Sequence, residues 1–103
     1  MAVVQWTDPA LEQLREITDF LAQHSAKKAT EVGEKVMAST RQLVHSPLMG
    51  RVVPEFQLDY LRELVVQGYH VLYVVRGETC SVVAVIHSGR NLENLVRPDE
   101  LET

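Results

Sequence analysis

Three side chains that could act on a phosphate group are spread over the second half of the sequence. They are an acid, Glu55, and two groups able to carry positive charge, Arg62 and His87. A carboxylate or an imidazole can move the proton of a 2′-hydroxyl, and a guanidinium can hold the phosphate that this hydroxyl attacks. If the fold brings the three together, the set suits RNA cleavage.

The same residues also have a purely structural interpretation. Arg62 could pair with Glu55 or Glu63, His87 could stand where a strand leaves a sheet, and Arg90 could be a solvated loop residue. The stretch GRVVPEFQLDYLREL would then be a structural signature at the entry to a sheet. Its members would be Gly50, Arg51, Pro54, Glu55 and Arg62, with the glycine and proline shaping the chain and the charged residues fastening it.

The elements that must position these residues can be read from apolar spacing. Helical spacing predicts helices over 9–23 and 26–45, with Thr7 or Asp8 capping the first and Ser25 the second. Runs of β-prone residues predict strands at 3–6, 61–66, 69–75 and 81–87. The order β-α-α-β-β-β predicts an α+β fold, in which a helical hairpin packs on one face of a mainly antiparallel four-stranded sheet.

Both faces of this sheet are predicted to be apolar. In the strand at 69–75, Tyr69, Val71, Tyr73 and Val75 should share one face, with Leu72 and Val74 on the other. In the strand at 81–87, strict alternation sets Val82, Ala84 and Ile86 against Val83 and Val85. One helical hairpin covers one face, so the second face is either a partner surface or is covered by the 47–59 loop and the C-terminal segment.

Length, net charge and cysteine content further limit the classes of function that this sequence can have. The 103 residues suit one domain, 1–103, with a short helical turn at 91–96 and a flexible tail from about residue 97. The net charge of −4 argues against a nucleic-acid binder, because phosphate contacts need a basic excess. The lone Cys80 cannot form an internal disulfide. The sequence also lacks the pattern of a signal peptide and of a membrane span, so a cytoplasmic protein is expected.

No metal or cofactor is expected either. The four histidines, His24, His45, His70 and His87, show no metal-ligand spacing, and Cys80 is interpreted as a small core residue. Neither a glycine-rich phosphate loop nor a nucleophile elbow is present.

The chain nevertheless resembles a known family. VVQWTDPALEQLREITDFLAQHS, SPLMGRVVPE, LREL, YHVLYVV and VVAVIHSGR follow one another in the order found in ParE-like toxins of the RelE/ParE superfamily, which belong to bacterial type II toxin–antitoxin modules. The resemblance covers residues 3 to 90. It implies a toxin without cofactor that inhibits DNA gyrase by binding. It also implies a ParD-like antitoxin whose disordered segment folds as it wraps the toxin.

Relatives on the RelE branch instead cut mRNA on the ribosome, and they are basic. Here the charge is −4, no lysine follows Lys35 and no tyrosine follows Tyr73. The leading hypothesis is therefore a gyrase inhibitor without catalytic residues. The alternatives are an mRNA endoribonuclease that uses Glu55, Arg62 and His87, and a non-toxic antitoxin-binding module.

The resemblance also suggests binding surfaces. The gyrase contact is expected at the end of the last strand and beyond it, at His87, Arg90, Asn91 and Leu92. The antitoxin is expected on apolar residues of the open sheet face and of the helix grooves. A toxin dimer or a toxin–antitoxin hetero-oligomer is compatible with the sequence.

Overall fold

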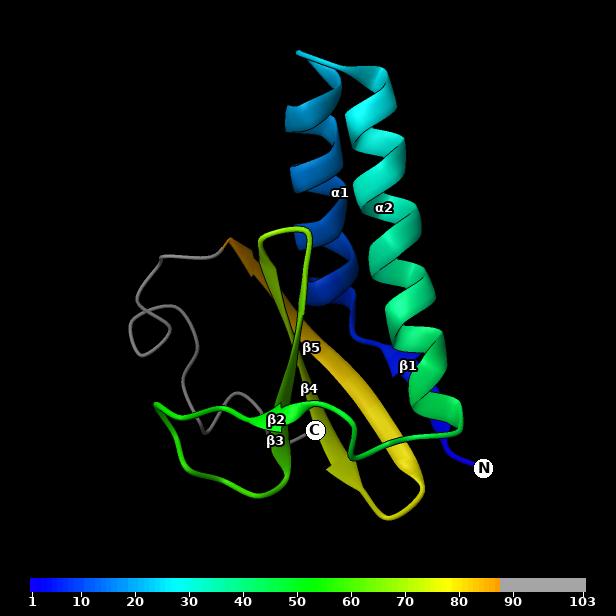
Figure 1. The fold of residues 1–103 in the computed structure, drawn as a ribbon, viewed down its shortest axis with the longest axis vertical. Coiled ribbons are helices and arrows are strands. Elements are labelled where there is room, and N and C mark those ends of the chain that lie inside the picture. Colours follow the sequence, from blue (N-terminus) through cyan, green and yellow to red (C-terminus); the bar gives the residue numbers. More distant parts are fainter. Residues whose placement is uncertain (88–103) are drawn as a thin grey trace.

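The computed structural model describes residues 1–87 and shows a helical hairpin on one face of a five-stranded sheet (Figure 1). The helices are α1 (Asp8–Ala22) and α2 (Ala26–Arg41), and a 3-10 turn, η1 (Gln42–Val44), follows the second. The strands are β1 (Val3–Trp6), β2 (Arg51–Val52), β3 (Leu61–Val66), β4 (Tyr69–Arg76) and β5 (Thr79–His87). This confirms the predicted α+β fold.

The sheet has the strand order β1-β5-β4-β3-β2. Strand β1 pairs with β5 in parallel, and the other neighbours are antiparallel. The sequence predicted four strands and missed β2, because a strand of two residues, Arg51 and Val52, carries too little periodicity to be recognised. It lies at the edge of the sheet, beside β3.

Local sequence explains where the elements begin and turn. The Thr7 side chain accepts a hydrogen bond from Ala10 N, and Ser25 does the same for Lys28 N, so each helix has a side-chain N-cap. The β3–β4 hairpin turns on Gln67 and Gly68, both with positive φ, as a two-residue hairpin requires. The β4–β5 loop is shorter than the predicted 76–79, because the strands continue to Arg76 and resume at Thr79.

Each face of the sheet has its own apolar core. Against the helices lie Val71, Tyr73, Cys80, Val82 and Val85, and the opposite face holds Val53, Leu61, Leu72, Val74, Ala84 and Ile86. Phe56, Leu58 and Tyr60 pack onto the second core. Residues of the 47–59 loop therefore cover part of the face that the sequence left as either a partner surface or a covered one.

The predicted alternation holds in β4 and is wrong in β5. A register shift pairs Leu72 with Ala84 but Tyr73 with Val82, so Val83 is the extra residue of a bulge. Because of the bulge, Val82 and Val85 both belong to the core beneath the helices. A single inserted residue moves every later side chain of the strand to the other face of the sheet. The pattern of apolar residues in the sequence does not indicate where such an insertion occurs.

Candidate functional site

The buried acid Glu63 lies on the face of β3 away from the helices. It is 2% exposed, and its carboxylate accepts from Arg51 Nε at 2.6 Å and from His70 Nδ1 at 2.8 Å. An ionised carboxylate can only accept, so the hydrogen in the second bond sits on Nδ1. A buried charge is costly unless it is paired, and these two partners, from β2 and β4, supply the pairing. The arrangement fastens the short strand β2 to the sheet.

The turn before β2, residues 47–50, is held from the helix side of the sheet. The Tyr73 hydroxyl donates to Pro47 O at 2.8 Å and accepts from Gly50 N at 2.9 Å. Arg62 Nη1 donates to Leu48 O at 3.3 Å and to Gly50 O at 3.0 Å. A buried tyrosine and an arginine thus bind successive backbone groups of one turn, and we call residues 47–50 the clasped turn.

Gly50 is required by the closeness of this packing. A Cβ added there would lie 2.7 Å from Glu63 O and 2.7 Å from Tyr73 Oη. Burial also raises the pKa of Tyr73, against a smaller lowering by its hydrogen bond from Gly50. The hydroxyl therefore stays protonated, as its bond to Pro47 O requires.

The three residues that could have formed a nuclease site do not converge. Arg62 and His87 are on opposite sides of β4, opposite Tyr73 and Tyr69 respectively. Arg62 and His87 are therefore separated by about 13 Å along the strands and by about 9.5 Å across them. Glu55 is exposed in the turn after Val53 and forms no hydrogen bond with another residue of the described part. Groups that share one reacting phosphate must come within hydrogen-bond reach of it.

The contacts of Arg62 are instead with backbone. Besides the two carbonyls of the clasped turn, its Nε donates to Asp59 O at 3.2 Å. Neither Glu55 nor Glu63 is its partner, so the arginine links both ends of the 48–59 segment to β3, and it forms no ion pair with another residue of 1–87. Pro54 is exposed next to Glu55 in the same segment.

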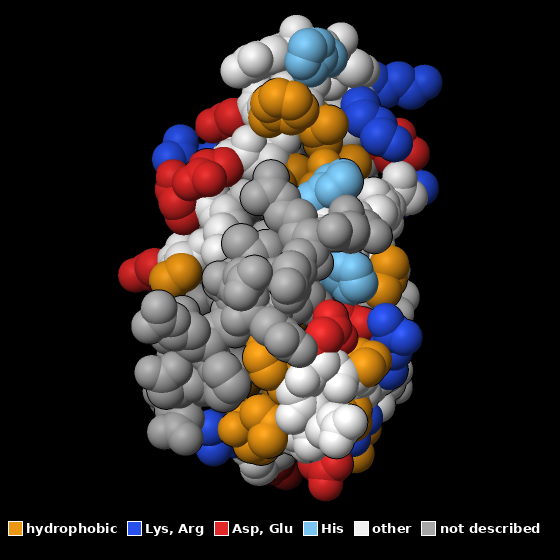
Figure 2. Space-filling model, turned by 90° about the vertical axis from the view of Figure 1, so that its left-hand side faces the viewer, with side chains coloured by type: hydrophobic (Ala, Val, Ile, Leu, Met, Phe, Trp, Pro, Cys, Tyr) orange, Lys and Arg blue, Asp and Glu red, His pale blue; other side chains and the backbone are white. Residues whose placement is uncertain are grey.

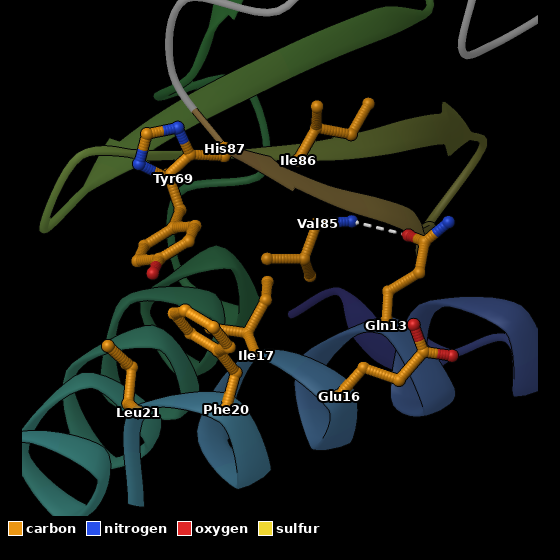
Figure 3. A pocket seen from close by; sticks show the side chains of 9 residues that line it. All are labelled: Gln13, Glu16, Ile17, Phe20, Leu21, Tyr69, Val85, Ile86 and His87. Atoms are coloured by element: carbon orange, nitrogen blue, oxygen red, sulfur yellow. Dashed lines mark hydrogen bonds between the residues drawn. The ribbon is translucent and has the colours of Figure 1, made fainter. Parts of the chain in front are cut away.

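An apolar groove of about 540 Å³ opens between α1 and the ends of β4 and β5 (Figure 3). Its lining is mainly aliphatic and aromatic, with polar groups at the rim: Gln13, Glu16, Ile17, Phe20, Leu21, Tyr69, Val85, Ile86 and His87. Phe20 is 60% exposed, and the rings of His87 and Tyr69 meet edge to face with centroids 5.3 Å apart. Gln13 links α1 to β5 at the edge of the groove, because its Oε1 accepts from Val85 N at 2.8 Å.

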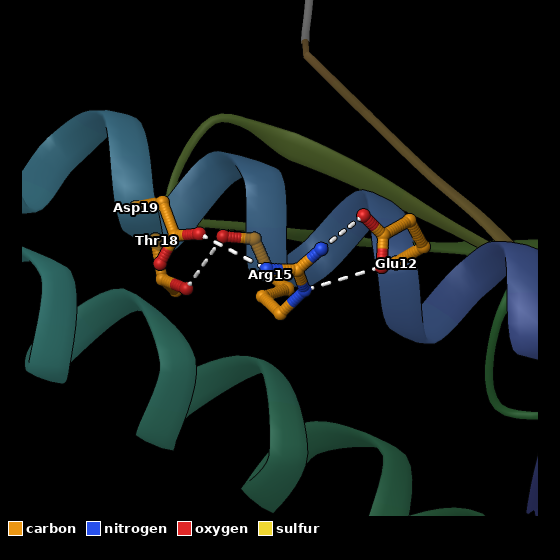
Figure 4. Close-up of polar contacts among 4 residues, drawn as sticks. All are labelled: Glu12, Arg15, Thr18 and Asp19. Carbon is orange, nitrogen blue, oxygen red and sulfur yellow. Dashed lines mark hydrogen bonds and ion pairs between the residues drawn. The ribbon is translucent and has the colours of Figure 1, made fainter.

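The outer surface of α1 beside this groove is acidic. Arg15 bonds Glu12 and lies 3.5 Å from Asp19, and Glu12 raises the pKa of this arginine (Figure 4). Such exposed pairs contribute little to stability. In Figure 2, acidic side chains gather beside apolar and histidine side chains in the upper half of this face. The groove therefore combines an apolar lining with a negatively charged border on its α1 side, where Glu16 lines it, and Lys and Arg side chains lie on the opposite side of this face in Figure 2.

Of the predicted target contacts, only His87 falls within the described residues. It is the exposed last residue of β5 and lines the groove. Arg90, Asn91 and Leu92 lie outside the described residues, as do the predicted helical turn at 91–96 and the tail from about 97.

Two further features concern residues 1–87 alone. Among them, no group of three or more His, Cys, Asp and Glu side chains is placed to hold a metal ion. None of the helices found there is long and apolar enough to cross a membrane.

Sequence reasoning missed that Glu63 is a buried charge bound by two side chains. It named this acid only as a partner for Arg62, although the two side chains lie on opposite faces of β3. A usable signal was present, because Glu63 sits in a predominantly apolar run, LRELVV, of a sheet whose two faces are both predicted to be apolar. A charge in such a strand needs partners from neighbouring strands.

Comparison with known proteins places the chain in a family. A family model described as the ParE toxin of the type II toxin–antitoxin system, parDE, matches residues 4–92. No curated protein matches the chain. A structure described as a chromosomal ParDE TA system from P. aeruginosa superposes with a TM-score of 0.70 at 18% identity, covering 85% of this chain and 97% of that one.

The isolated E. coli RelE toxin also shares the fold, with a TM-score of 0.64 at 15% identity, over 93% of this chain and all of that chain (100%). At these identities the two structures show the fold alone. The family model, which spans most of the sequence, decides membership: this chain belongs to the ParE toxin family of type II toxin–antitoxin systems.

Proposed function

We propose that this protein is a toxin that inhibits cytoplasmic DNA gyrase by binding it, and that a ParD-like antitoxin neutralises it. The observation that carries the proposal is the ParE family match over residues 4–92. The net charge of −4 supports binding rather than RNA chemistry. The separation of Glu55, Arg62 and His87 points the same way.

The gyrase contact is proposed at His87 together with Arg90, Asn91 and Leu92. His87 is exposed at the end of β5, which is where a contact continuing into the following residues would begin. A chain cut after Ser88 should lose toxicity and keep antitoxin binding. Toxicity that survives this truncation would rule out the contact.

The antitoxin is proposed to occupy the groove between α1 and β5. The floor offers Ile17, Phe20 and Leu21 to apolar residues of a segment that folds on binding, and Glu16 offers a charge at the rim. A fitting segment carries apolar residues at helical spacing with basic residues beside them.

The experiment that tests the target compares two purified reactions. The protein should block supercoiling by gyrase and trap its cleaved DNA complex, and it should leave ribosome-bound mRNA intact. The matched variant is Glu55→Ala with His87→Ala, two exposed positions whose loss would stop a nuclease.

Cleavage of mRNA that this double variant abolishes, with gyrase untouched, would replace the proposal by RelE-like endoribonuclease activity. Expression that affects neither gyrase nor mRNA nor growth would leave an antitoxin-binding module without toxicity.

A further inference from the structure

The clasped turn presents two large apolar side chains to solvent. Leu48 is 59% exposed and Met49 is 47% exposed, and neither belongs to the two apolar cores. Exposed apolar residues that occur singly are ordinary on protein surfaces. These two are adjacent, and the backbone that carries them is bound by the side chains of Tyr73 and Arg62.

Five of the seven backbone polar groups of residues 47–50 form hydrogen bonds within the described part of the chain. Met49 N donates to Ser46 O at 3.1 Å, which closes the turn, and the carbonyls of Pro47, Leu48 and Gly50 are bound by Tyr73 or Arg62. Fixing side chains before association lowers the entropy that binding would otherwise cost. Rigid, projecting apolar groups are what an interface uses as anchors.

The position of the turn separates it from the groove. It follows the lower end of α2 in Figure 1, whereas β5 reaches the groove at its far, upper end. A segment bound in the groove between α1 and β5 therefore leaves the turn free for another partner.

The charged side chains next to the turn indicate the chemistry of that partner. The Arg62 guanidinium bonds the turn itself, and Arg51, with a side chain 63% exposed, directly follows Gly50. Arg51 Nε is paired with the buried Glu63 carboxylate, so two guanidinium groups and one carboxylate lie next to the turn and leave an excess of one positive charge there, in a protein whose net charge is −4. The complement is an apolar pocket with carboxylates at its rim.

We infer that Leu48 and Met49 are a preformed anchor that inserts into an apolar, acid-rimmed pocket of the toxin's protein target. The inference rests on the proposed function, because it assumes that the protein acts by binding a target. It adds a second contact, distant from the end of β5.

The test is the double variant Leu48→Ser, Met49→Ser, compared with Val65→Ser. Val65 is 58% exposed on β3 and serves as the matched apolar control. The double variant should raise the concentration for half-inhibition of gyrase at least tenfold and relieve growth inhibition. Its melting temperature and antitoxin affinity should stay those of the wild type, and Val65→Ser should behave as the wild type throughout.

Gyrase inhibition equal to wild type in the double variant overturns the anchor and leaves the proposed function standing. If the wild-type protein does not inhibit gyrase, the proposed function is overturned. The anchor is then tested by comparing growth inhibition by the double variant with growth inhibition by the wild type. Relief of growth inhibition in the double variant supports the anchor, and growth inhibition that persists in the double variant overturns the anchor. A wild-type chain that does not inhibit growth removes both proposals.

A second pair of variants tests the acidic rim. Leu48→Glu and Leu48→Lys should both weaken gyrase inhibition, and the glutamate should weaken it about tenfold more, because like charges repel across an interface. Equal effects, or a stronger effect of lysine, would overturn the rim.

Discussion

The clasped turn and the groove between α1 and β5 both expose apolar side chains, but they are built in opposite ways. In the turn, the backbone is bound by the buried Tyr73 hydroxyl and by the partly exposed Arg62 guanidinium, and the two apolar side chains Leu48 and Met49 are largely exposed to solvent. In the groove, the side chains of α1, β4 and β5 form the surface by packing, with one hydrogen bond, Gln13 to Val85, across it. The turn presents a fixed shape, while the groove can adapt to what enters it.

The change that should break the turn most severely is Gly50→Ala. The added Cβ would lie 2.7 Å from Tyr73 Oη and from Glu63 O, so either the turn or the sheet has to move. We expect a loss of about 3 kcal/mol in the free energy of unfolding, typical of overpacking. Urea denaturation measures it. A stability equal to wild type would show that the turn is looser than its contacts indicate.

Tyr73→Phe should have the next largest effect, because it keeps the ring and removes only the hydroxyl. Pro47 O and Gly50 N then lose a partner, which costs about 2 kcal/mol. The variant also tests a pH dependence. Burial raises the pKa of Tyr73 above its ordinary value of 10.0, so the folded state holds this proton more tightly than the unfolded state. Its stabilising contribution is complete below pH 10 and is lost as the pH rises through the folded pKa.

The alkaline decline in stability should therefore be shallower in Tyr73→Phe than in wild type. Denaturation midpoints measured from pH 8 to 11 reveal it. Burial likewise raises the pKa of the Cys80 thiol, so Cys80→Ala is needed to separate the two contributions. Parallel pH curves for Tyr73→Phe and wild type would contradict the prediction.

In the groove, a substitution is expected to change the affinity for the antitoxin and to leave the stability of the fold nearly unchanged. Phe20→Ser removes an apolar side chain that is 60% exposed, so the free energy of unfolding should change by less than about 0.5 kcal/mol. Antitoxin affinity should fall about tenfold, or about 1.4 kcal/mol. Calorimetric titration measures this, with Leu11→Ser, on the same helix but outside the groove, as control. Equal losses in both variants would show that the groove is not the antitoxin site.

The smallest expected effect is a gain. Gly33 lies inside α2, and a Cβ there would meet Thr18 Cγ2 at 3.6 Å, an ordinary contact. Gly33→Ala should raise the free energy of unfolding by about 0.8 kcal/mol, the helix-propensity difference. Thermal denaturation checks it. Destabilisation would mean that α1 and α2 need the glycine after all, and neither the turn nor the groove should respond to the change.

Sequence was sufficient for both helices and for four of the five strands of residues 1–87, and it was insufficient for the pairing of the strands. Helical spacing and the caps at Thr7 and Ser25 located both helices, and Gln67-Gly68 located a hairpin, because these are local signals. The bulge at Val83 and the two-residue β2 depend on contacts between strands, and neither leaves a periodic trace.

The candidate site likewise has features that local sequence predicts and features that depend on contacts between strands. GRVVPEFQLDYLREL was recognisable as a signature, and the structure shows what its arginines contact. Which charged residue is buried depended on register, since a shift of one residue exchanges Arg62 and Glu63 between the two faces of β3. The backbone of the clasped turn is bound by Tyr73, which follows Gly50 by 23 residues, so this contact could not be read locally.

The parallel pairing of β1 with β5 also bears on synthesis of the protein. Gln5 bonds Ser81, 76 residues further along the chain. During translation, at roughly 5–20 residues per second, β1 must wait several seconds for a partner strand. A nascent chain thus lacks its completed sheet until nearly the whole described part has been made. A product of translation that stops before β5 therefore cannot complete this sheet, because β1 has no other neighbouring strand within residues 1–87.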